Sequence, residues 1–340
     1  MGRLAIPQRI VERPARAARQ GQRHMAARWI SVRLATLPFD AVRFDVRGFG
    51  ACPTETRETL EGHGRAFVTG FNAALAAPTA NALIDRLSDL NPEERGFGHE
   101  GAGMAWGMLE TVHLIAPERW HEFIYRADRY RYLIHVGCGW AMARLHRRRP
   151  RLWGTLDPLL RWLAFDGWGF HEGFFRPQRT ITQQRRSRRL RGYELRAFDQ
   201  GLGRSLWFVA GANSDEISDI IGRFENVRHP DLWSGVGLAA AYAGGVPAEG
   251  LRALISASGR YAAHARQGAA FAAKARVHAG NVAPATELAV KVLCNGLSVQ
   301  EAAAVTDDAL AGLARDGSAR DYEQWRATIT DALPSGGGGG

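Results

Sequence analysis

The chain contains almost no lysine and little cysteine. Lysine occurs only at Lys274 and Lys291, so nearly all of the 44 basic residues are arginine. This bias, together with abundant alanine and glycine, is typical of a GC-rich coding sequence rather than of selection for phosphate contacts. The cysteines Cys52, Cys138 and Cys294 are odd in number and far apart. Their spacing excludes a disulfide framework and favours a reducing compartment.

Motifs that would identify a cofactor are also absent. The sequence has no phosphate-binding loop, no glycine-rich dinucleotide turn, no Cys-x-x-Cys pair and no Gly-x-Ser-x-Gly elbow. No window reaches the roughly 18 apolar residues that span a bilayer. Residues 1–30 are rich in arginine but lack the apolar core of a secretory signal. We therefore expect a cytoplasmic protein, with weak peripheral membrane contact through this arm as the alternative.

The formal net charge of +10 is carried partly by two arginine clusters. Nothing near them resembles a base-reading module, so we expect no nucleic-acid partner. The clusters are either solvated loops or a site for an acidic carrier protein or a phosphate-bearing ligand. The arginines that such a partner would contact are Arg147, Arg148, Arg149, Arg186 and Arg189.

A short phrase ending in glycine recurs along the chain at intervals of 28 to 39 residues. Its anchoring glycines are Gly62, Gly101, Gly137, Gly173, Gly201, Gly235 and Gly268. Such a period predicts stacked helical hairpins, and glycine allows close approach between helices at about 1 kcal/mol of helix propensity. The fold class predicted is all-α: a helical-hairpin repeat array, either an α-solenoid or a tightly curled α/α superhelix with a tetratricopeptide-like period near 34.

The composition divides the chain into three parts. Residues 1–54 are expected to form an irregular or partly helical basic arm, and the apolar alternation at 42–49 predicts a short extended segment there. Residues 55–333 are expected to form the helical repeat domain, in which 298–301 have the spacing of a capping box. Residues 334–340 form a glycine tail.

Polar side chains occupy one or both of the two positions before each glycine in the middle of the array. Two positions before it stand His99, His135, His171 and Asp199, and one position before it stand Glu100, Glu172, Gln200, Ser234 and Gln267. Equivalent positions of stacked repeats face the same side, so a row of imidazoles and carboxylates is expected. Such a row fits general acid–base catalysis or metal ligation. The alternative is that each group caps its own helix.

The spacing between packed helices limits which of these residues could bind one metal ion. Packed helices lie about 8–10 Å apart, whereas zinc ligands lie about 2 Å from the ion. His99 and His171 could share a metal only if the array curls tightly or closes into a ring. No metal ligands are therefore assigned, and the catalytic candidates are His99, Glu100, Asp166, His171, Glu172 and Asp199.

Aromatic residues cluster around Asp166 and His171. They form either plain core packing or the wall of an apolar small-molecule pocket. The candidates for substrate binding are His135, Trp168, Phe170, Phe174, Arg204, Trp207 and Trp233.

Several long phrases resemble one bacterial family in order along the chain. They read VRGF (46–49), ERGFGHEG (94–101), HVGCGWA (135–141), FDGWGFHEG (165–173), AFDQGLGRSLW (197–207) and DLWSGVGL (231–238). In these phrases the chain resembles domain-of-unknown-function family 1702, whose members occur in enediyne polyketide gene clusters. The resemblance implies a role in bacterial natural-product biosynthesis, on a polyene-derived intermediate. It brings no established reaction and no catalytic residue.

Two hypotheses of different classes follow. In the first, a helical-repeat cradle binds a hydrophobic polyene-derived intermediate or its carrier protein while other enzymes perform the chemistry. In the second, the protein is a cofactor-free or metal-dependent isomerase or cyclase that acts through the His/Asp/Glu row. Convergence of these side chains on one cavity would favour the enzyme, whereas side chains that point apart would remove it.

Overall fold

A computed structural model describes residues 36–146 and 150–334. Contacts divide the chain into two units, Met1–Leu37 and Pro38–Gly340. All helices of the described ranges belong to the second unit, and these ranges contain no strand. The all-α prediction is therefore confirmed. No helix among the described residues combines the length and the apolar character needed to cross a membrane.

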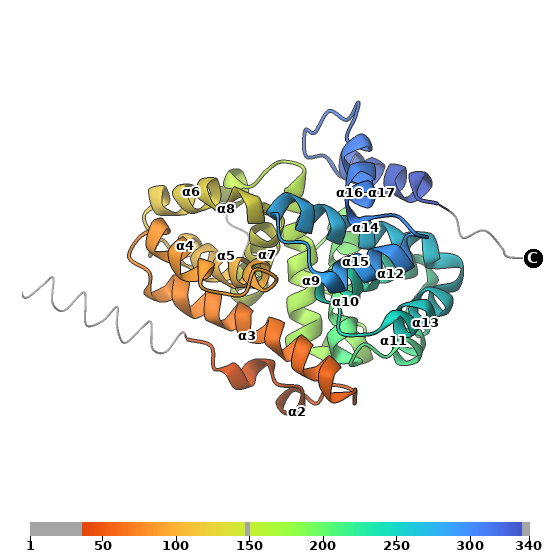
Figure 1. The fold of residues 1–340 in the computed structure, drawn as a ribbon. Coiled ribbons are helices and arrows are strands. Elements are labelled where there is room, and N and C mark those ends of the chain that lie inside the picture. The colour runs from red at the N-terminus through yellow and green to blue at the C-terminus, as the bar shows by residue number, and fades with distance from the viewer. Residues whose placement is uncertain (1–35, 147–149, 335–340) are drawn as a thin grey trace, which may run out of the picture. The chain divides into compact units, whose positions relative to one another are not determined.

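The centre of this unit is a succession of long helices, which we call the inner helices (Figure 1). Each packs along the next one in the chain, and α14 then packs against α16. From α5 to α12 nearly every side chain is buried, so these helices have no solvent face. The inner helices are α3 (Thr54–Ala76), α5 (Arg95–Thr111), α7 (Arg131–Leu145), α9 (Leu163–Phe175), α10 (Tyr193–Val209), α12 (His229–Ala243) and α14 (Ala262–Ala279).

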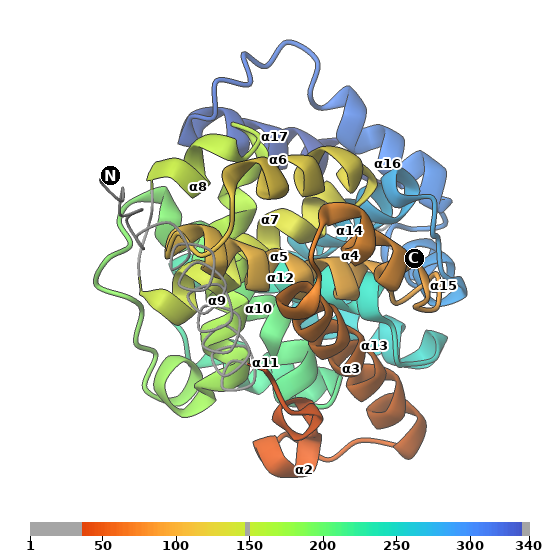
Figure 2. The same ribbon diagram turned by 90° about the vertical axis from the view of Figure 1, so that its left-hand side faces the viewer.

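Shorter helices alternate with the inner ones and cover them; Figure 2 shows α4 and α6 on the side of α5. They are amphipathic: α6, for example, buries Trp120 and Phe123 and exposes much of its remaining surface. These outer helices are α4 (Ala80–Ser88), α6 (Pro117–Arg126), α8 (Pro150–Thr155), α11 (Ser214–Gly222), α13 (Ala248–Ser258) and α15 (Pro284–Leu293).

Short connecting helices and a C-terminal pair complete the unit. The pair is α16 (Val299–Asp308), which begins with the predicted capping box between Ser298 and Glu301, and α17 (Ala319–Ala332). The other elements are α2 (Phe44–Arg47), the 3-10 helices η1 (Phe39–Val42), η2 (Asp128–Tyr130), η3 (Leu160–Trp162), η5 (Asn226–Arg228) and η6 (Gly259–Tyr261), and the π-helix η4 (Gln178–Thr182).

The late inner helices return to the early ones. The imidazole of His63 in α3 hydrogen-bonds the carbonyl of Ala243 at the end of α12 over 2.8 Å. Arg276 in α14 donates to the carbonyl of Glu93, in the loop before α5, over 2.6 Å. Because both contacts join residues about 180 positions apart, the succession of inner helices closes on itself and encloses a centre.

Glycine sets the spacing between neighbouring inner helices. A Cβ on Gly201 of α10 would lie 1.7 Å from the carbonyl oxygen of Asp166 in α9. Two residues on, a Cβ on Gly203 would lie 2.1 Å from the carbonyl oxygen of Leu232 in α12. The first glycine of each pair thus contacts the preceding helix and the second contacts the following one. The same contacts recur at Gly101, Gly137, Gly139, Gly167, Gly169, Gly235, Gly237 and Gly268.

Two of the seven predicted anchors are wrong. In α9 the glycine that meets the preceding backbone is Gly167, whereas a Cβ on Gly173 would meet the Ser205 hydroxyl. In α3 a Cβ on Gly62 would meet only the tips of the Glu94 and Arg65 side chains. His171 and Glu172 therefore do not occupy the same register as His99 and Glu100. Phe165 and Asp166 take those positions in α9.

The extended segment predicted for 42–49 is also wrong, because η1 and α2 occupy most of it. Its apolar alternation has no sheet to face: Phe44 is buried whereas Val46 is 57% exposed. Asp45 in the first turn and Gly48 in the left-handed conformation at the C-terminus bound the short helix α2 instead.

Candidate functional site

A cavity of about 40 Å³ lies among the inner helices α7, α9, α10, α12 and α14. Helix α17 contributes Trp325 to its wall, and Tyr132 and Lys274 supply polar groups. The rest of the wall is mostly apolar, and the cavity is lined by Tyr132, Leu133, Val136, Leu163, Asp166, Arg204, Leu238, Tyr242, Phe271, Ala272, Lys274, Ala275 and Trp325. Val136 and Asp166 directly precede the first glycine of their helices, and Arg204, Leu238 and Phe271 follow it by three residues. These two positions therefore face the centre.

A buried ion pair lies in the cavity wall. Arg204 Nη1 of α10 donates to Asp166 Oδ1 of α9 over 2.5 Å, and both side chains are buried. The guanidinium also lies over the ring of Phe170, 4.8 Å from its centroid. Asp166 Oδ2 and Arg204 Nε are buried and have no hydrogen-bond partner among the described residues. The pair, whose two residues line the cavity, thus keeps one buried acceptor and one buried donor unused.

A second carboxyl lies behind this pair. Glu100, in the position of α5 equivalent to Asp166 in α9, is buried and interacts electrostatically with Arg204 and Asp166. Burial raises the pKa of Glu100 to about 7, although Arg204 favours its charged form. Burial likewise raises the pKa of Asp166 against the effect of Arg204. Glu100 Oε1 and the hydroxyl of Tyr242 lack hydrogen-bond partners within the described ranges.

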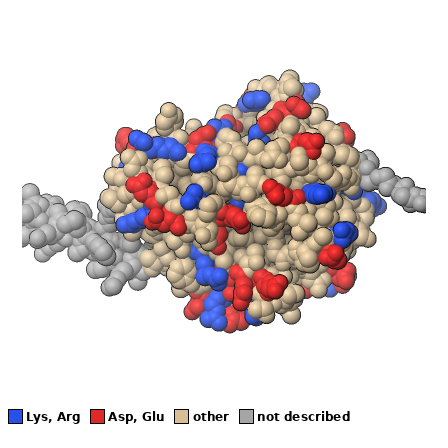
Figure 3. Space-filling view, in the orientation of Figure 1, with Lys and Arg blue, Asp and Glu red and all other residues tan. Residues whose placement is uncertain are grey.

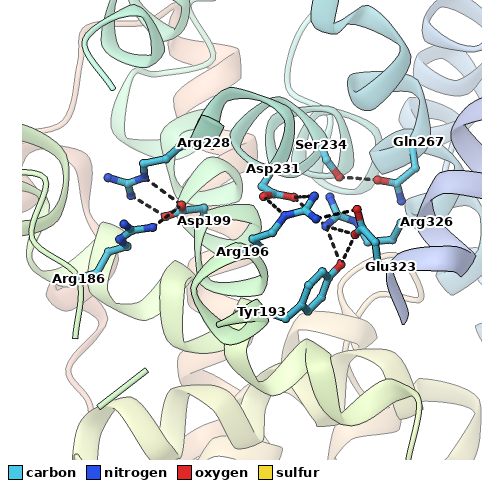
Figure 4. Close-up of polar contacts among 10 residues, drawn as sticks. All are labelled: Arg186, Tyr193, Arg196, Asp199, Arg228, Asp231, Ser234, Gln267, Glu323 and Arg326. Carbon is cyan, nitrogen blue, oxygen red and sulfur yellow. Dashed lines mark hydrogen bonds and ion pairs between the residues drawn. The ribbon is translucent and has the colours of Figure 1, made fainter. Parts of the chain in front are cut away.

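The same register position carries uncharged polar groups on the later helices. Ser234 of α12 donates its hydroxyl to Gln267 Oε1 of α14 over 2.7 Å (Figure 4). The amide of Gln200 in α10 is buried, and neither of its polar atoms has a partner among the described residues. The central row thus contains several polar side chains whose hydrogen bonds are incomplete.

His99 and His135 instead face the outer layer. Each donates Nδ1–H to the carbonyl four residues earlier in its own helix, over 2.7 Å. His99 stacks on Tyr130 with ring centroids 3.9 Å apart, and His135 Nε2 accepts the amide of Asp157 over 3.0 Å. Burial lowers the pKa of both imidazoles to about 4. They are neutral side chains that fix the packing between the two layers.

Asp199 shares the outward position of the two histidines. Arg228 of η5 donates two hydrogen bonds to its carboxylate, over 2.9 and 2.5 Å, and Arg186 adds a third over 3.2 Å (Figure 4). Both oxygens of Asp199 are therefore occupied. This carboxylate holds the segment before α10 and the segment before α12 against the inner helices.

A further ion-pair network fixes α17 over the cavity (Figure 4). Arg326 of α17 and Arg196 of α10 both donate to the buried carboxylate of Asp231, over 2.7 and 2.9 Å. Glu323 of α17 accepts from Arg196 over 2.6 Å. Because Trp325 lies between Glu323 and Arg326 in the same helix, this network holds the indole in the cavity wall.

His171 and Glu172 lie apart from the central pair, near the end of α9. His171 Nδ1 lies 3.4 Å from Glu172 Oε1, and Arg176 Nη1 contacts the same oxygen over 3.2 Å. Burial lowers the pKa of His171, although Glu172 favours its charged form. Neither imidazole nitrogen has a hydrogen-bond partner in the described part of the chain. The ring packs against Trp140 and Phe175 instead.

The predicted aromatic residues are all buried. Phe170 and Phe174 pack together with Trp140 at centroid distances of 5.0 to 6.3 Å. Trp168 is fully buried, and Trp207 donates its indole N–H to the carbonyl of Gly244 over 2.9 Å. Trp233 lines a surface pocket beside His229 and Tyr261.

Of the predicted site residues, the structure thus brings together Glu100, Asp166, Arg204 and Phe170. It places His99, His135 and Asp199 between the layers, and His171 and Glu172 at the far end of α9. Sequence reasoning missed Tyr242, Phe271 and Trp325. For Phe271 the signal was present, since it follows its glycine by the same three residues as Arg204.

The arginines proposed for an acidic partner either form hydrogen bonds within the protein or lie outside the described residues. Arg186 contacts Asp199, and Arg189 donates to the carbonyl of His146. The cluster 147–149 lies outside the described residues. On the face drawn in Figure 3, basic and acidic side chains are interspersed.

No group of three or more His, Cys, Asp or Glu side chains is arranged to hold a metal ion within the described ranges. A family model described as "Protein of unknown function (DUF1702)" matches residues 26–333. No curated protein and no solved structure matches the chain. Because the family model covers nearly the whole sequence, including every inner helix and the cavity, the chain belongs to the DUF1702 family.

Proposed function

We propose that this protein binds an apolar, polyene-derived intermediate of bacterial natural-product biosynthesis in the central cavity. The observation that carries the proposal is the set of unused polar atoms at an otherwise apolar cavity, on Asp166 and Arg204. An unsatisfied buried polar group costs about 1–3 kcal/mol, more when it is charged. A ligand with one polar end and an apolar chain would satisfy these atoms and fill the cavity.

The cavity must enlarge to hold such a ligand. Its volume of about 40 Å³ suffices for only a few water molecules, whereas small-molecule sites typically measure about 300–1,000 Å³. We infer that α17 moves, because Trp325 covers the cavity from a helix near the end of the chain. The glycine contacts between the inner helices support this view, because they hold the other walls of the cavity in place.

The substrate class rests on the family resemblance in the sequence phrases at 94–101 and 165–173. Members of that family occur in enediyne polyketide gene clusters, whose products derive from polyenes. The apolar lining, with Phe271, Trp325 and Leu238 facing one ion pair, is compatible with a conjugated chain ending in a carbonyl or carboxyl group.

A fluorescent polyene fatty acid, cis-parinaric acid, tests the proposal. Saturable enhancement of its emission is expected with the full-length protein. Ala272→Leu, which fills the cavity from α14, should weaken binding at least tenfold, and Trp325→Leu, which enlarges it, should preserve or strengthen binding. Ala304→Leu on the exposed face of α16 is the matched control. No binding by the wild type, or equal binding by Ala272→Leu and the control, would overturn the proposal.

A carrier protein as partner is the second candidate. Arg179, Arg185, Arg188 and Arg191 are exposed on the segment between α9 and α10, and an acidic protein surface would complement them. Charge reversal of two of them, Arg185→Glu with Arg188→Glu, should weaken binding of an acidic acyl carrier protein. Unchanged binding at low ionic strength would remove this candidate.

A further inference from the structure

The charges in the central site do not balance. Glu100 and Asp166 supply two buried carboxyls, and Arg204 is the cation that hydrogen-bonds Asp166 and interacts electrostatically with Glu100. Keeping an uncompensated charge in a dry interior costs several kcal/mol. One of the two carboxyls therefore retains its proton near neutral pH. Asp166 carries the hydrogen bond from Arg204, so Asp166 is the ionised member and Glu100 the neutral one.

Among the charged groups on the other surrounding helices, Arg326 of α17 also favours the ionised form of Asp166. Arg276 of α14 donates to the carbonyls of Glu93 and Tyr242. Arg326 of α17 contacts Asp231, and Lys274 of α14 contacts Asp307. Burial raises the pKa of the remaining hydroxyls, on Tyr132, Tyr242 and Tyr322, and keeps them neutral. On α7, the cavity-lining residues next to the site, Val136 and Leu133, are apolar.

The unused atoms of the ion pair form a base beside a donor. Asp166 Oδ2 lacks a partner, and so does Arg204 Nε–H, and both residues line the cavity. A carboxylate next to a cationic N–H, with a neutral carboxylic acid behind them, can remove a proton from carbon while stabilising the negative oxygen that develops. The raised pKa of Asp166 strengthens it as a base.

We propose that Asp166 and Arg204 isomerise the ligand of this cavity, moving a carbon–carbon double bond from the β,γ to the α,β position of an unsaturated ketone or thioester. Asp166 removes a proton from the α-carbon, and the C–H electrons form an enolate whose oxygen accepts the Arg204 Nε–H. The proton then returns from Asp166 to the γ-carbon as the carbonyl re-forms. The formula of the ligand is unchanged, so no oxidant or cofactor is consumed.

Glu100 acts as a positioning residue in this scheme. Its neutral form leaves Arg204 free to stabilise the enolate, whereas its ionised form adds a competing negative charge. Since the pKa of Glu100 is about 7, the wild-type rate should fall as the pH rises through that value. Glu100→Gln imitates the neutral form and should remove this fall.

The test uses a β,γ-unsaturated acyl thioester, the N-acetylcysteamine ester of 3-decenoic acid, with full-length protein in D₂O. Conjugation is followed by ultraviolet absorbance. NMR reports the hydrogen isotope at the γ-carbon, which should be mainly the proton removed from the α-carbon and not deuterium from the solvent. Asp166→Asn should lower the rate at least 100-fold. Arg204→Lys keeps the cation but loses the Nε–H and should lower it at least tenfold. Glu122→Gln, which removes an exposed ion pair with Arg126 on the outer helix α6, is the control.

The inference rests on the proposed function, and the two fail differently. Absence of cis-parinaric acid binding by the wild type would remove the proposed function. Binding without isomerisation, or isomerisation at the wild-type rate in a folded Asp166→Asn or Arg204→Lys protein, would overturn the inference alone. If Asp166→Asn does not fold, Arg204→Lys and the pH profile of Glu100→Gln decide the question.

Discussion

Replacing Gly201 by alanine probes the closest approach between two inner helices. The added Cβ would lie 1.7 Å from the carbonyl oxygen of Asp166, and ordinary contacts between such atoms need about 3.4 Å or more. Helices α9 and α10 must therefore separate by more than about 1 Å, and neither backbone can yield locally. Overpacking of this kind costs about 1–3 kcal/mol or more. Even after the gain of about 1 kcal/mol in helix propensity, we expect a net loss of about 2 kcal/mol.

Gly62→Ala is the matched control, since Gly62 also lies within a long inner helix. Its Cβ would meet Glu94 Oε1 at 3.3 Å and Arg65 Nη2 at 3.6 Å, both at the ends of flexible side chains. These side chains can move aside at little cost. The substitution should therefore be neutral or stabilising by up to about 1 kcal/mol.

Urea denaturation followed by circular dichroism gives the free energy of unfolding of each variant. We expect Gly201→Ala to lower the midpoint and to leave the slope unchanged, because the fold persists with α9 and α10 slightly farther apart. Equal stability of Gly201→Ala and Gly62→Ala would refute the glycine register. It would mean that a methyl group fits between α9 and α10 at Gly201, contrary to the close backbone contact in the structure.

Three further predictions concern the buried charges. Arg204→Met leaves Asp166 unpaired and should cost about 3–5 kcal/mol at pH 7; urea midpoints should show the deficit shrinking in acid, where Asp166 is protonated. The pKa of Glu100 is about 7 in the folded protein and near 4.5 in the unfolded chain. The free energy of unfolding of the wild type should therefore fall by about 3 kcal/mol relative to Glu100→Gln as the pH rises across that interval. A difference between the two proteins that does not change with pH in urea denaturation would contradict this. His99 and His135 stay neutral down to about pH 4 in the folded protein. Because the unfolded chain takes up these protons first, the free energy of unfolding should fall as the pH drops from 6.5 to 4. NMR titrations that give these imidazoles of the folded protein a pKa of 6.5 would disprove this.

The sequence predicted the helices well because the glycine phrases carry two signals at once. Each phrase combines a helical apolar period with small residues at fixed spacing, and both follow from backbone contact between neighbours. The prediction failed at Gly173 because His171-Glu172-Gly173 has the same sequence as His99-Glu100-Gly101. The physically decisive feature was instead the paired spacing of Gly167 and Gly169, since one glycine serves each neighbouring helix.

The direction of the polar rows could not be read from the sequence. Successive residues of a helix point about 100° apart, so His99 and Glu100 face different layers although they are adjacent. Which of the two faces the centre depends on how the helices pack against each other. The sequence cannot distinguish the row of His99 from the row of Glu100, because both contain polar residues. The glycine spacing predicts which residues align from helix to helix. Only the tertiary contacts show which layer each row faces.

The outward row and the central row differ in how many of their polar atoms already have hydrogen-bond partners. In the outward row, Asp199 has both oxygens occupied by arginines and His135 uses both ring nitrogens, so neither has a bond left for a ligand. In the central row, Asp166 and Glu100 each keep an oxygen without a partner among the described residues. Burial makes such vacancies costly, and a fold that needed only stability would do better with apolar side chains there. The retained polarity therefore argues for chemistry at the centre of the inner helices rather than at the outward row.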